Sequence, residues 1–182
     1  MVRYTAGARS GRKSGPTPTN LIAVTPAVTI RSTAVSEMDN NIYLLTSVSS
    51  GDQLLIDAAD DMAAIGQLLR AAGKDAAAPV LRVIITTHSH TDHTRALRAL
   101  ATATEATVLA GQDDAVAIEQ QTGIPVKRGL LHGDKVSVDG VALDVIGLRG
   151  HTPGSIALAY AVDNEPVHLF TGDSLFPGGV GN

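Results

Sequence analysis

The sequence predicts a mixed α/β domain in which helices pack outside β-sheets. Two observations carry this prediction. Strand-like and helix-like segments alternate from residue 40 to residue 123, and apolar positions then recur with a period of two from residue 135 onward. The chain has 182 residues, of which 44% are hydrophobic and 18% charged, so it is long enough and apolar enough to form a core.

The first segments show strand composition. Residues 21–31 are rich in β-branched side chains and threonine, which predicts an edge strand with Pro26 at a permitted position. Residues 41–48 and 53–57 predict two further strands, joined by a turn at residues 49–52.

Helical spacing appears next. Asp60 or Asp61 is a suitable cap for a helix that runs to about residue 72, where Gly73 would end it. Residues 80–86 form a nearly continuous apolar run, which is typical of a strand buried on both faces. Residues 94–103 are then expected to be helical.

The second half is richer in hairpins. Residues 107–110 predict a short strand, and Asp113 or Asp114 is expected to open a short helix ending near residue 123. The remaining predicted strands are residues 135–138, 142–148, 155–162 and 166–170. Asp139–Gly140 suits a type I′ turn between the first two of these.

Charge is unevenly distributed along the chain. Residues 1–36 contain five basic residues and no acid, whereas residues 37–182 contain nine basic and eighteen acidic residues. We therefore expect a flexible basic leader over residues 1–20 and one folded domain over residues 21–182. An acidic body and short apolar runs argue against nucleic-acid and membrane partners, and we expect a cytoplasmic protein.

The segment TTHSHTDHT, directly after the apolar run, carries an unusual concentration of metal-binding side chains. His88, His90, Asp92 and His93 fall within six positions, although the whole chain has only six histidines. Helix capping would need a single oxygen, so it does not explain this density. Imidazoles grouped with a carboxylate indicate a metal site, and the lack of cysteine leaves histidine and carboxylate as its ligands.

Four motifs together resemble those of the metallo-β-lactamase-fold hydrolases. HSHTDH resembles their HxHxDH motif, and it is accompanied in the same order by Asp57 in LLIDAAD, His151 in GHTPGS and Asp173 in LFTGDSLF. The resemblance implies an αββα sandwich whose C-terminal part is incomplete. An aspartate at the position of Asp173 resembles the glyoxalase II branch.

The resemblance also implies roles for these side chains. The implied metal ligands are His88, His90 and His151 for a first metal, Asp92 and His93 for a second, and Asp173 as a bridge between the two. Asp57 would orient ligands without binding, and Asp92 would also help to move a proton during catalysis. The family's last ligand histidine has no counterpart after Asp173, so the chain is expected to be truncated before it.

The activity that the resemblance implies is metal-dependent hydrolysis of a small-molecule substrate. Two zinc ions per subunit would be expected in the intact protein, with iron or manganese as alternatives, and hydroxide generated there would cleave an ester, thioester or amide bond. Two alternatives remain open. The first is a persulfide dioxygenase with one iron held by His88, His151 and Asp173, and the second is a truncated metal-binding domain without catalytic activity.

Overall fold

The computed structural model describes residues 18–163, 165–176 and 178–181, which form two large sheets and three α-helices. The first sheet has seven strands in the order of the chain: β1 (Asn20–Val24), β2 (Val28–Val35), β3 (Asn40–Ser47), β4 (Asp52–Ile56), β5 (Val80–Thr86), β6 (Thr107–Gly111) and β7 (Arg128–Leu130). The pairs from β1 to β4 are antiparallel, and those from β4 to β7 are parallel.

The second sheet has the order β11-β10-β9-β8 and is antiparallel throughout. Its strands are β8 (Lys135–Val138), β9 (Val141–Gly147), β10 (Ile156–Tyr160) and β11 (His168–Phe170). A small hairpin of β12 (Leu175–Phe176) and β13 (Gly179–Val180) follows. The three helices are α1 (Met62–Ala72), α2 (Leu97–Thr104) and α3 (Ala115–Thr122).

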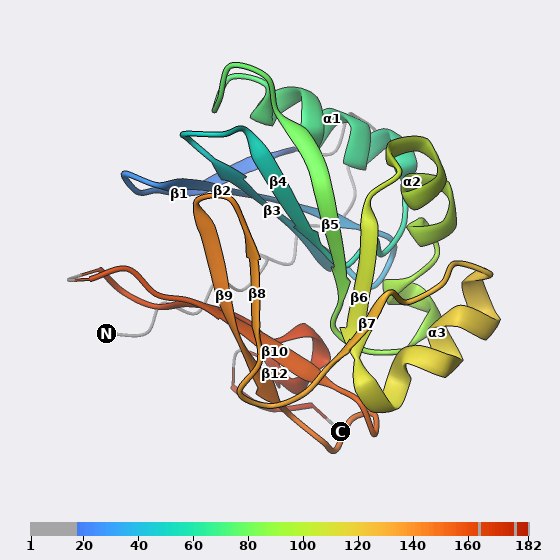
Figure 1. Ribbon diagram of the computed structural model, residues 1–182. Helices are drawn as coiled ribbons and strands as arrows, with labels where there is room; N and C mark the ends of the chain where they lie inside the picture. The colour runs from blue at the N-terminus through green and yellow to red at the C-terminus, as the bar shows by residue number, and fades with distance from the viewer. Residues whose placement is uncertain (1–17, 164, 177, 182) are drawn as a thin grey trace.

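These elements form layers. In Figure 1 the helices lie along one side of the seven-stranded sheet, and the second sheet lies on the other side. The predicted mixed α/β class is confirmed, and the described residues supply the helix, sheet and sheet layers of the expected αββα sandwich.

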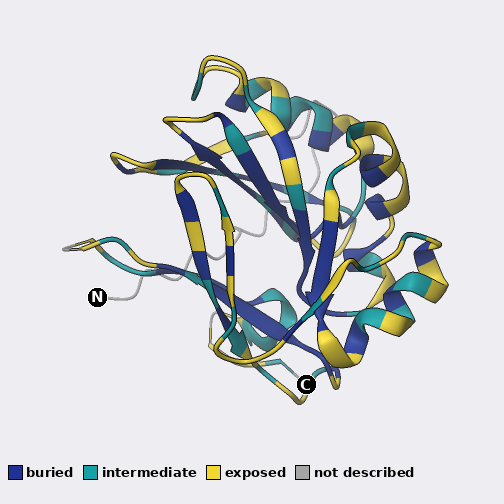
Figure 2. Cartoon of the chain, in the orientation of Figure 1, coloured by how far each residue is buried: buried dark blue, intermediate teal, exposed yellow. Residues whose placement is uncertain are grey.

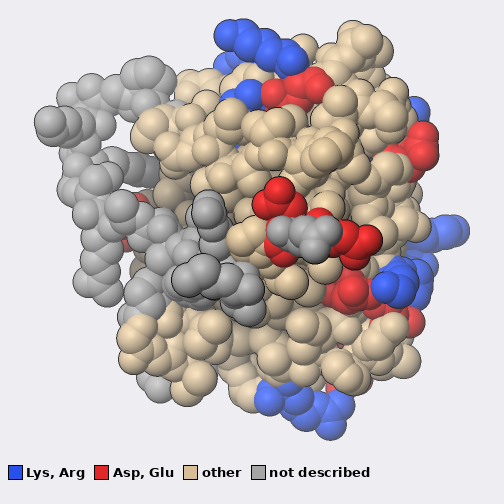
Figure 3. All heavy atoms as spheres, turned by 90° about the vertical axis from the view of Figure 1, so that its left-hand side faces the viewer, with Lys and Arg blue, Asp and Glu red and all other residues tan. Residues whose placement is uncertain are grey.

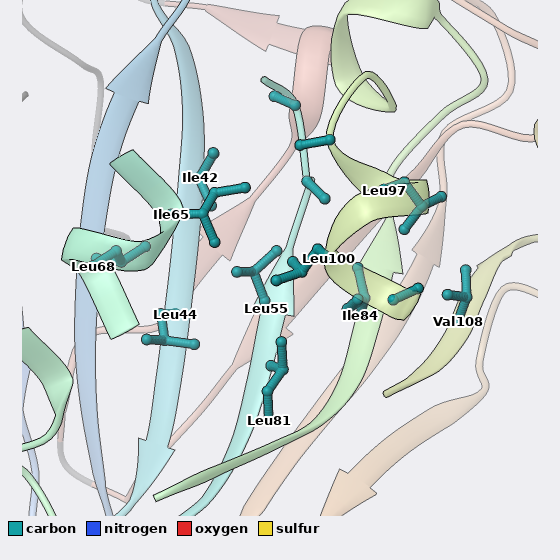
Figure 4. Packing of buried hydrophobic residues seen from close by; sticks show 14 of the residues in the cluster. Ile42, Leu44, Leu55, Ile65, Leu68, Leu81, Ile84, Leu97, Leu100 and Val108 are labelled. Atoms are coloured by element: carbon teal, nitrogen blue, oxygen red, sulfur yellow. The ribbon is translucent and has the colours of Figure 1, made fainter. Parts of the chain in front are cut away.

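Apolar side chains fill the space between the helices and the first sheet. Ile65 and Leu68 of α1 are fully buried and lie near Ile42 and Leu44 of β3 (Figure 4). Leu97 of α2 belongs to the same cluster. Burying such a side chain is worth about 1.5–3 kcal/mol, so this cluster fixes α1 and α2 against the sheet.

A second cluster joins the two sheets. Inward-facing residues of β8 and β9 alternate with exposed or half-buried ones, as expected for a sheet with one face in the core, whereas β10 is buried at four of its five positions. Val136, Leu143 and Leu158 pack in this way with Leu54 and Ile85 of the first sheet. Figure 2 shows the resulting buried strand segments on both sides of the interface.

The prediction of one edge strand over residues 21–31 was wrong. The chain turns between β1 and β2, which pair as an antiparallel hairpin, so β1 is the edge and β2 is internal. Thr25 stabilises the turn, because its hydroxyl accepts a hydrogen bond from the amide of Val28 at 2.9 Å and donates to the same residue's carbonyl at 3.0 Å. The threonine-rich composition of this segment indicated a strand, whereas the side chain of Thr25 closes a turn.

Several predicted elements differ in detail. α2 begins at Leu97 and not at residue 94, because residues 91–93 form a 3-10 turn. β5 is exposed at Val80 and Arg82 and continuously buried only from Ile84 to Thr86, and the short β7 was not predicted. The hairpin at Asp139–Gly140 is confirmed, but only Gly140 has a positive φ (78°), so the turn is not type I′.

The helix over residues 62–72 begins and ends as predicted. Asp61 accepts hydrogen bonds from the amides of Ala63 and Ala64, both at 3.1 Å, and Gly73 follows the last turn. Most of the predicted leader lies outside the described residues, and Asn20 already belongs to β1. Among the described residues, none of the helices combines the length and apolar character needed to span a membrane.

Candidate metal centre

The candidate site lies beyond the carboxyl ends of the central parallel strands, where α/β proteins commonly place functional groups. β4 leads directly to Asp57, and β5 leads to the loop that carries His88, His90 and His93. The second sheet contributes two further loops, with His151 between β9 and β10 and Asp173 after β11. Segments far apart in the sequence therefore meet at the junction of the two sheets.

Three of the predicted ligands form one compact group. His88, His90 and His151 each place one ring nitrogen within 4.8 Å of the other two. The ring centroids of His88 and His90 lie 4.7 Å and 4.5 Å, respectively, from that of His151. His88 is buried and His90 is exposed, so the group opens from the protein interior toward solvent.

A second group contains His88, His93 and Asp173, again with one ligand atom each within 4.8 Å. His93 Nε2 lies 3.2 Å from Asp173 Oδ1. Both groups include His88, so the two candidate positions adjoin each other. The sequence-based set for the second metal was Asp92 and His93 with Asp173 as a bridge, and the described geometry adds His88 to it.

Asp92 lies beside the second group. Its Oδ2 is 3.8 Å from His93 Nε2 and accepts a hydrogen bond from Asn40 Nδ2 at 2.8 Å. Asn40 also donates to the backbone carbonyl of Asp92 at 3.1 Å. Burial raises the pKa of Asp92, but the Asn40 hydrogen bond and the charge of His93 outweigh it and leave this pKa below its ordinary value.

Asp57 connects the two buried histidines. It accepts a hydrogen bond from His93 Nδ1 at 2.9 Å, and from the amide and hydroxyl of Thr87 at 2.7 Å and 2.8 Å. Because Thr87 donates its only hydroxyl proton to Asp57, its oxygen can only accept from His88 Nδ1, which is 3.0 Å away. Both histidines are thereby protonated at Nδ1 and turn Nε2 toward the ligand groups.

The two buried histidines have opposite pKa shifts. For His88, burial and the nearby charge of His93 lower the pKa to about 4. For His93, burial acts in the same direction, but the carboxylates of Asp57 and Asp173 outweigh it and raise the pKa to about 10. The same contact with His93 holds the pKa of Asp173 below its ordinary value, although burial raises it. A metal at the second group would have to displace the proton of His93.

The donor set fits a metal ion. In the part of the chain that the structure describes, the buried Nε2 atoms of His88 and His93 have no hydrogen-bond partner. Buried polar atoms are normally paired, so two such atoms beside a carboxylate are unusual for a site without a ligand. Imidazole with carboxylate is a donor set suited to zinc or iron.

Sequence reasoning missed two residues that support this centre, Thr87 and Asn40. Thr87 lies within the quoted TTHSHTDHT segment, but its contact with Asp57 depends on a residue 30 positions away. Gly172, which precedes Asp173, permits a close approach of the backbone to Thr87. Its φ is 50°, and a Cβ there would lie 2.4 Å from the Thr87 hydroxyl.

Comparison with known proteins identifies the family. Residues 35–182 match the Metallo-beta-lactamase superfamily. The chain belongs to this superfamily. Relatives include hydroxyacylglutathione hydrolases from Pseudomonas entomophila (strain L48) and Anaeromyxobacter dehalogenans (strain 2CP-C), each 35% identical over 144 residues. Those matches cover 79% of this chain and 50% and 49% of the two relatives, so the chain spans about half the length of these superfamily members.

Solved structures from the superfamily share the fold. A metallo-beta-lactamase from Staphylococcus aureus subsp. aureus COL superposes with a TM-score of 0.72 at 22% identity, over 86% of this chain and 46% of that one. ETHE1 from Myxococcus xanthus superposes with a TM-score of 0.66 at 27% identity, over 84% of this chain and 60% of that one.

Proposed function

We propose that this protein is a metal-dependent hydrolase that cleaves a thioester or a related ester or amide bond. The observation that carries the proposal is the pair of ligand groups that share His88. Two adjacent cation positions suit a hydrolytic reaction, because one can polarise a carbonyl while the other holds the attacking water.

Zinc is the proposed metal, at two ions per intact subunit. When bound, zinc lowers the pKa of water to about 7 and so supplies a nucleophile at neutral pH. The first ion would be held by His88, His90 and His151. The second would be held by His93 and Asp173, with Asp173 placed to bridge and with Asp92 or His88 completing the set.

The chain's own residues would act on the substrate in defined ways. Asp92, the proposed catalytic group, is half-buried and fixed by Asn40, so its carboxylate can orient water and accept a proton. Asp57 would hold the two buried rings in place. His90 is exposed, and therefore the substrate would approach from its side of the site.

The relatives above support a thioester substrate, because they are hydroxyacylglutathione hydrolases at 35% identity. A cavity of about 280 Å³ adjoins the loop of His151, but none of the six candidate metal ligands lines it, so it carries no argument about the substrate.

An iron dioxygenase is a second candidate function. Its three ligands would be His88, His151 and Asp173, and His151 Nε2 lies 3.8 Å from Asp173 Oδ2. A metal-binding domain without catalytic activity is the third candidate.

Metal analysis separates these candidates. The protein would be purified without added metal, its zinc and iron measured per chain, and thioester hydrolysis and oxygen consumption assayed. Two zinc ions with thioester hydrolysis lost on His90→Ala would support the hydrolase. One iron with oxygen consumption in the presence of a persulfide would support the dioxygenase, and bound metal without either activity would support the third candidate.

The partner predictions are part of the same proposal. Figure 3 shows one face of the described molecule, on which Lys and Arg lie in separate groups near the outline, and Asp and Glu lie both beside these groups and nearer the middle. A nucleic-acid groove would instead need a continuous basic band. The cytoplasmic location stays a prediction.

A further inference from the structure

Asp114 lies beside the candidate metal centre, in the 3-10 turn between β6 and α3. Its residue exposure is 2%. The sequence suggested a helix-opening role for this aspartate. The side chain nevertheless makes no capping hydrogen bond to α3, although the residue stands at the helix N-cap. Its burial therefore needs another explanation.

The carboxylate of Asp114 accepts three hydrogen bonds from two different loops. Oδ2 accepts from the amide of Ser89 at 2.8 Å and from the hydroxyl of Thr152 at 2.6 Å. Oδ1 accepts from the amide of Gly154 at 2.8 Å. A buried carboxylate with three donors is well satisfied, and each contact is charge-assisted.

The bonded residues are the immediate neighbours of the candidate ligands. Ser89 lies between His88 and His90, and Thr152 directly follows His151. These three histidines come from two loops, on different sheets, and belong to one ligand group. Asp114 thus connects the two loops at the positions where their rings must meet.

The donors around Asp114 require that both of its carboxyl oxygens accept hydrogen bonds. Thr152 donates its hydroxyl proton to Asp114, so its oxygen accepts from the Ser155 hydroxyl at 2.6 Å. Ser155 in turn accepts from the amide of Thr152 at 3.0 Å. An asparagine at position 114 would direct its NH₂ group toward one of these donors, which would break at least one contact.

Close backbone packing supports the same role. A Cβ on Gly154 would lie 2.8 Å from the carboxyl carbon of Asp114, and one on Gly111 would lie 1.8 Å from the carbonyl oxygen of Gly154. The loop of His151 therefore rests directly against the end of β6, without an intervening side chain.

We propose that Asp114 is a positioning residue for the metal centre, which ties the loop of His88 and His90 to the loop of His151 so that the three rings converge. This inference rests on the proposed metal-binding function. It assigns no contact between Asp114 and the metal or the substrate.

Zinc affinity and amide hydrogen exchange test the proposal. Asp114→Ala and Asp114→Asn would be compared with Asp75→Ala. Asp75 is a matched control, because its side chain is 6% exposed and also accepts three hydrogen bonds, from Thr29 and Arg31, on the other side of β5. Thr152→Val, which removes one of the three hydrogen bonds to Asp114 and keeps the side-chain shape, covers the case in which Asp114→Ala does not fold.

We expect the zinc dissociation constant, measured by chelator competition on folded protein, to rise about 10–100-fold in Asp114→Ala. Asp114→Asn and Thr152→Val should show smaller rises, and Asp75→Ala none. In metal-free protein, the amides of Ser89 and Gly154 should exchange faster in Asp114→Ala but not in Asp75→Ala. An altered visible spectrum of the cobalt-substituted variant would add support, since it reports ligand geometry.

The outcomes distinguish this proposal from the proposed function. If the wild-type chain binds no zinc, the proposed function fails, and the exchange rates of the metal-free protein still decide whether Asp114 joins the loops. Unchanged exchange at Ser89 and Gly154 would overturn the inference. An equal loss of zinc affinity in Asp114→Ala and Asp75→Ala would also overturn it, because the effect would then be one of general stability.

Discussion

Clusters of buried charged side chains lie at both ends of β5, and the two clusters are arranged differently. Before the strand begins, Asp75 accepts hydrogen bonds from Arg31 and Thr29 at 2.7–2.8 Å. After the strand ends, His93 forms ion pairs with Asp57 at 2.9 Å and with Asp173 at 3.2 Å, and the Nε2 atom of His88 has no hydrogen-bond partner among the described residues.

The difference separates a stabilising cluster from one suited to function. The Arg31–Asp75 cluster pairs its charges with good geometry, which favours the folded state. The histidine cluster leaves buried nitrogen atoms directed at a common point, which costs stability unless something binds there. Changes to the histidine cluster should therefore act on metal binding and activity as well as on stability, whereas changes to the Arg31–Asp75 cluster should act on stability alone.

The largest expected effect is that of His88→Ala, because both ligand groups contain His88. Metal content should fall at both positions, and hydrolysis of a thioester substrate should fall by about 10³-fold or more, since a metal supplies several kcal/mol of transition-state stabilisation. Elemental analysis and a thioester assay measure these. His132→Ala is the control for metal content, because His132 is exposed and belongs to neither group. Retention of full metal content by His88→Ala would remove the distinction between the two clusters.

Asn40→Ala should have the next largest effect. Asp92 would lose the two contacts that fix it, and we expect activity or second-metal affinity to fall about 10–100-fold. Asn41→Ala is a matched control, because neighbouring residues of a strand point to opposite faces. Steady-state kinetics at saturating zinc, together with zinc titration, would measure both variants. Equal losses in the two would count against a specific role for Asn40.

Asp57→Asn tests whether the ion pair of His93 contributes to stability with the expected dependence on pH. A raised pKa of about 10 for His93 means that its ion pair stabilises the metal-free fold fully below about pH 6.5, and that this contribution is lost as the pH rises through about 10. Urea unfolding from pH 6 to pH 10 should show this loss in the wild type and much less of it in Asp57→Asn.

At pH 6.5 the Asp57→Asn variant should be less stable by about 3 kcal/mol, because a buried pair is broken. Asparagine tolerates the positive φ of this position, which is 59°. Asp61→Asn is the control, with a similar φ of 53° and a capping role that asparagine can retain. A comparable loss in Asp61→Asn would indicate a backbone effect and not an electrostatic one.

The smallest expected effect is that of Asp75→Asn, a loss of about 1–3 kcal/mol with unchanged zinc affinity. Burial raises the pKa of Asp75, but the hydrogen bonds from Arg31 and Thr29 outweigh it and lower this pKa. The contribution is therefore present above the ordinary carboxyl pKa and is lost as the pH falls through the lowered one. Unfolding at pH 7 and pH 3 measures it, and Asp52→Asn, in a more exposed pair, should change stability much less.

The sequence predicted the histidine cluster and the central strands well, because both are encoded locally. Six positions contain four metal-binding side chains, and an apolar run marks β5 whatever surrounds it. Asn40 and Asp114 could not be predicted in the same way. Their roles depend on partners 52 positions away in one case and 25 to 40 in the other, and a single sequence carries no signal for such contacts.

Local sequence patterns did not predict the conformation of two turns. The threonine-rich composition of residues 21–31 indicated one strand, but the hydroxyl of Thr25 closes a turn within it. The Asp139–Gly140 pair identified a hairpin, yet it did not determine the turn type, because that depends on the φ of Asp139 as well. The place of the Asp139–Gly140 turn along the chain was therefore predicted, whereas its backbone conformation was not.

The strand order of the first sheet has a consequence for how the protein folds. Each strand from β1 to β7 pairs with the next one along the chain, so the sheet can grow by successive short loop closures, which cost little chain entropy. His151 and Asp173 arrive only with the second sheet. Assembly of the ligand groups should therefore be a late folding step, and zinc added during refolding should slow unfolding more than it speeds folding.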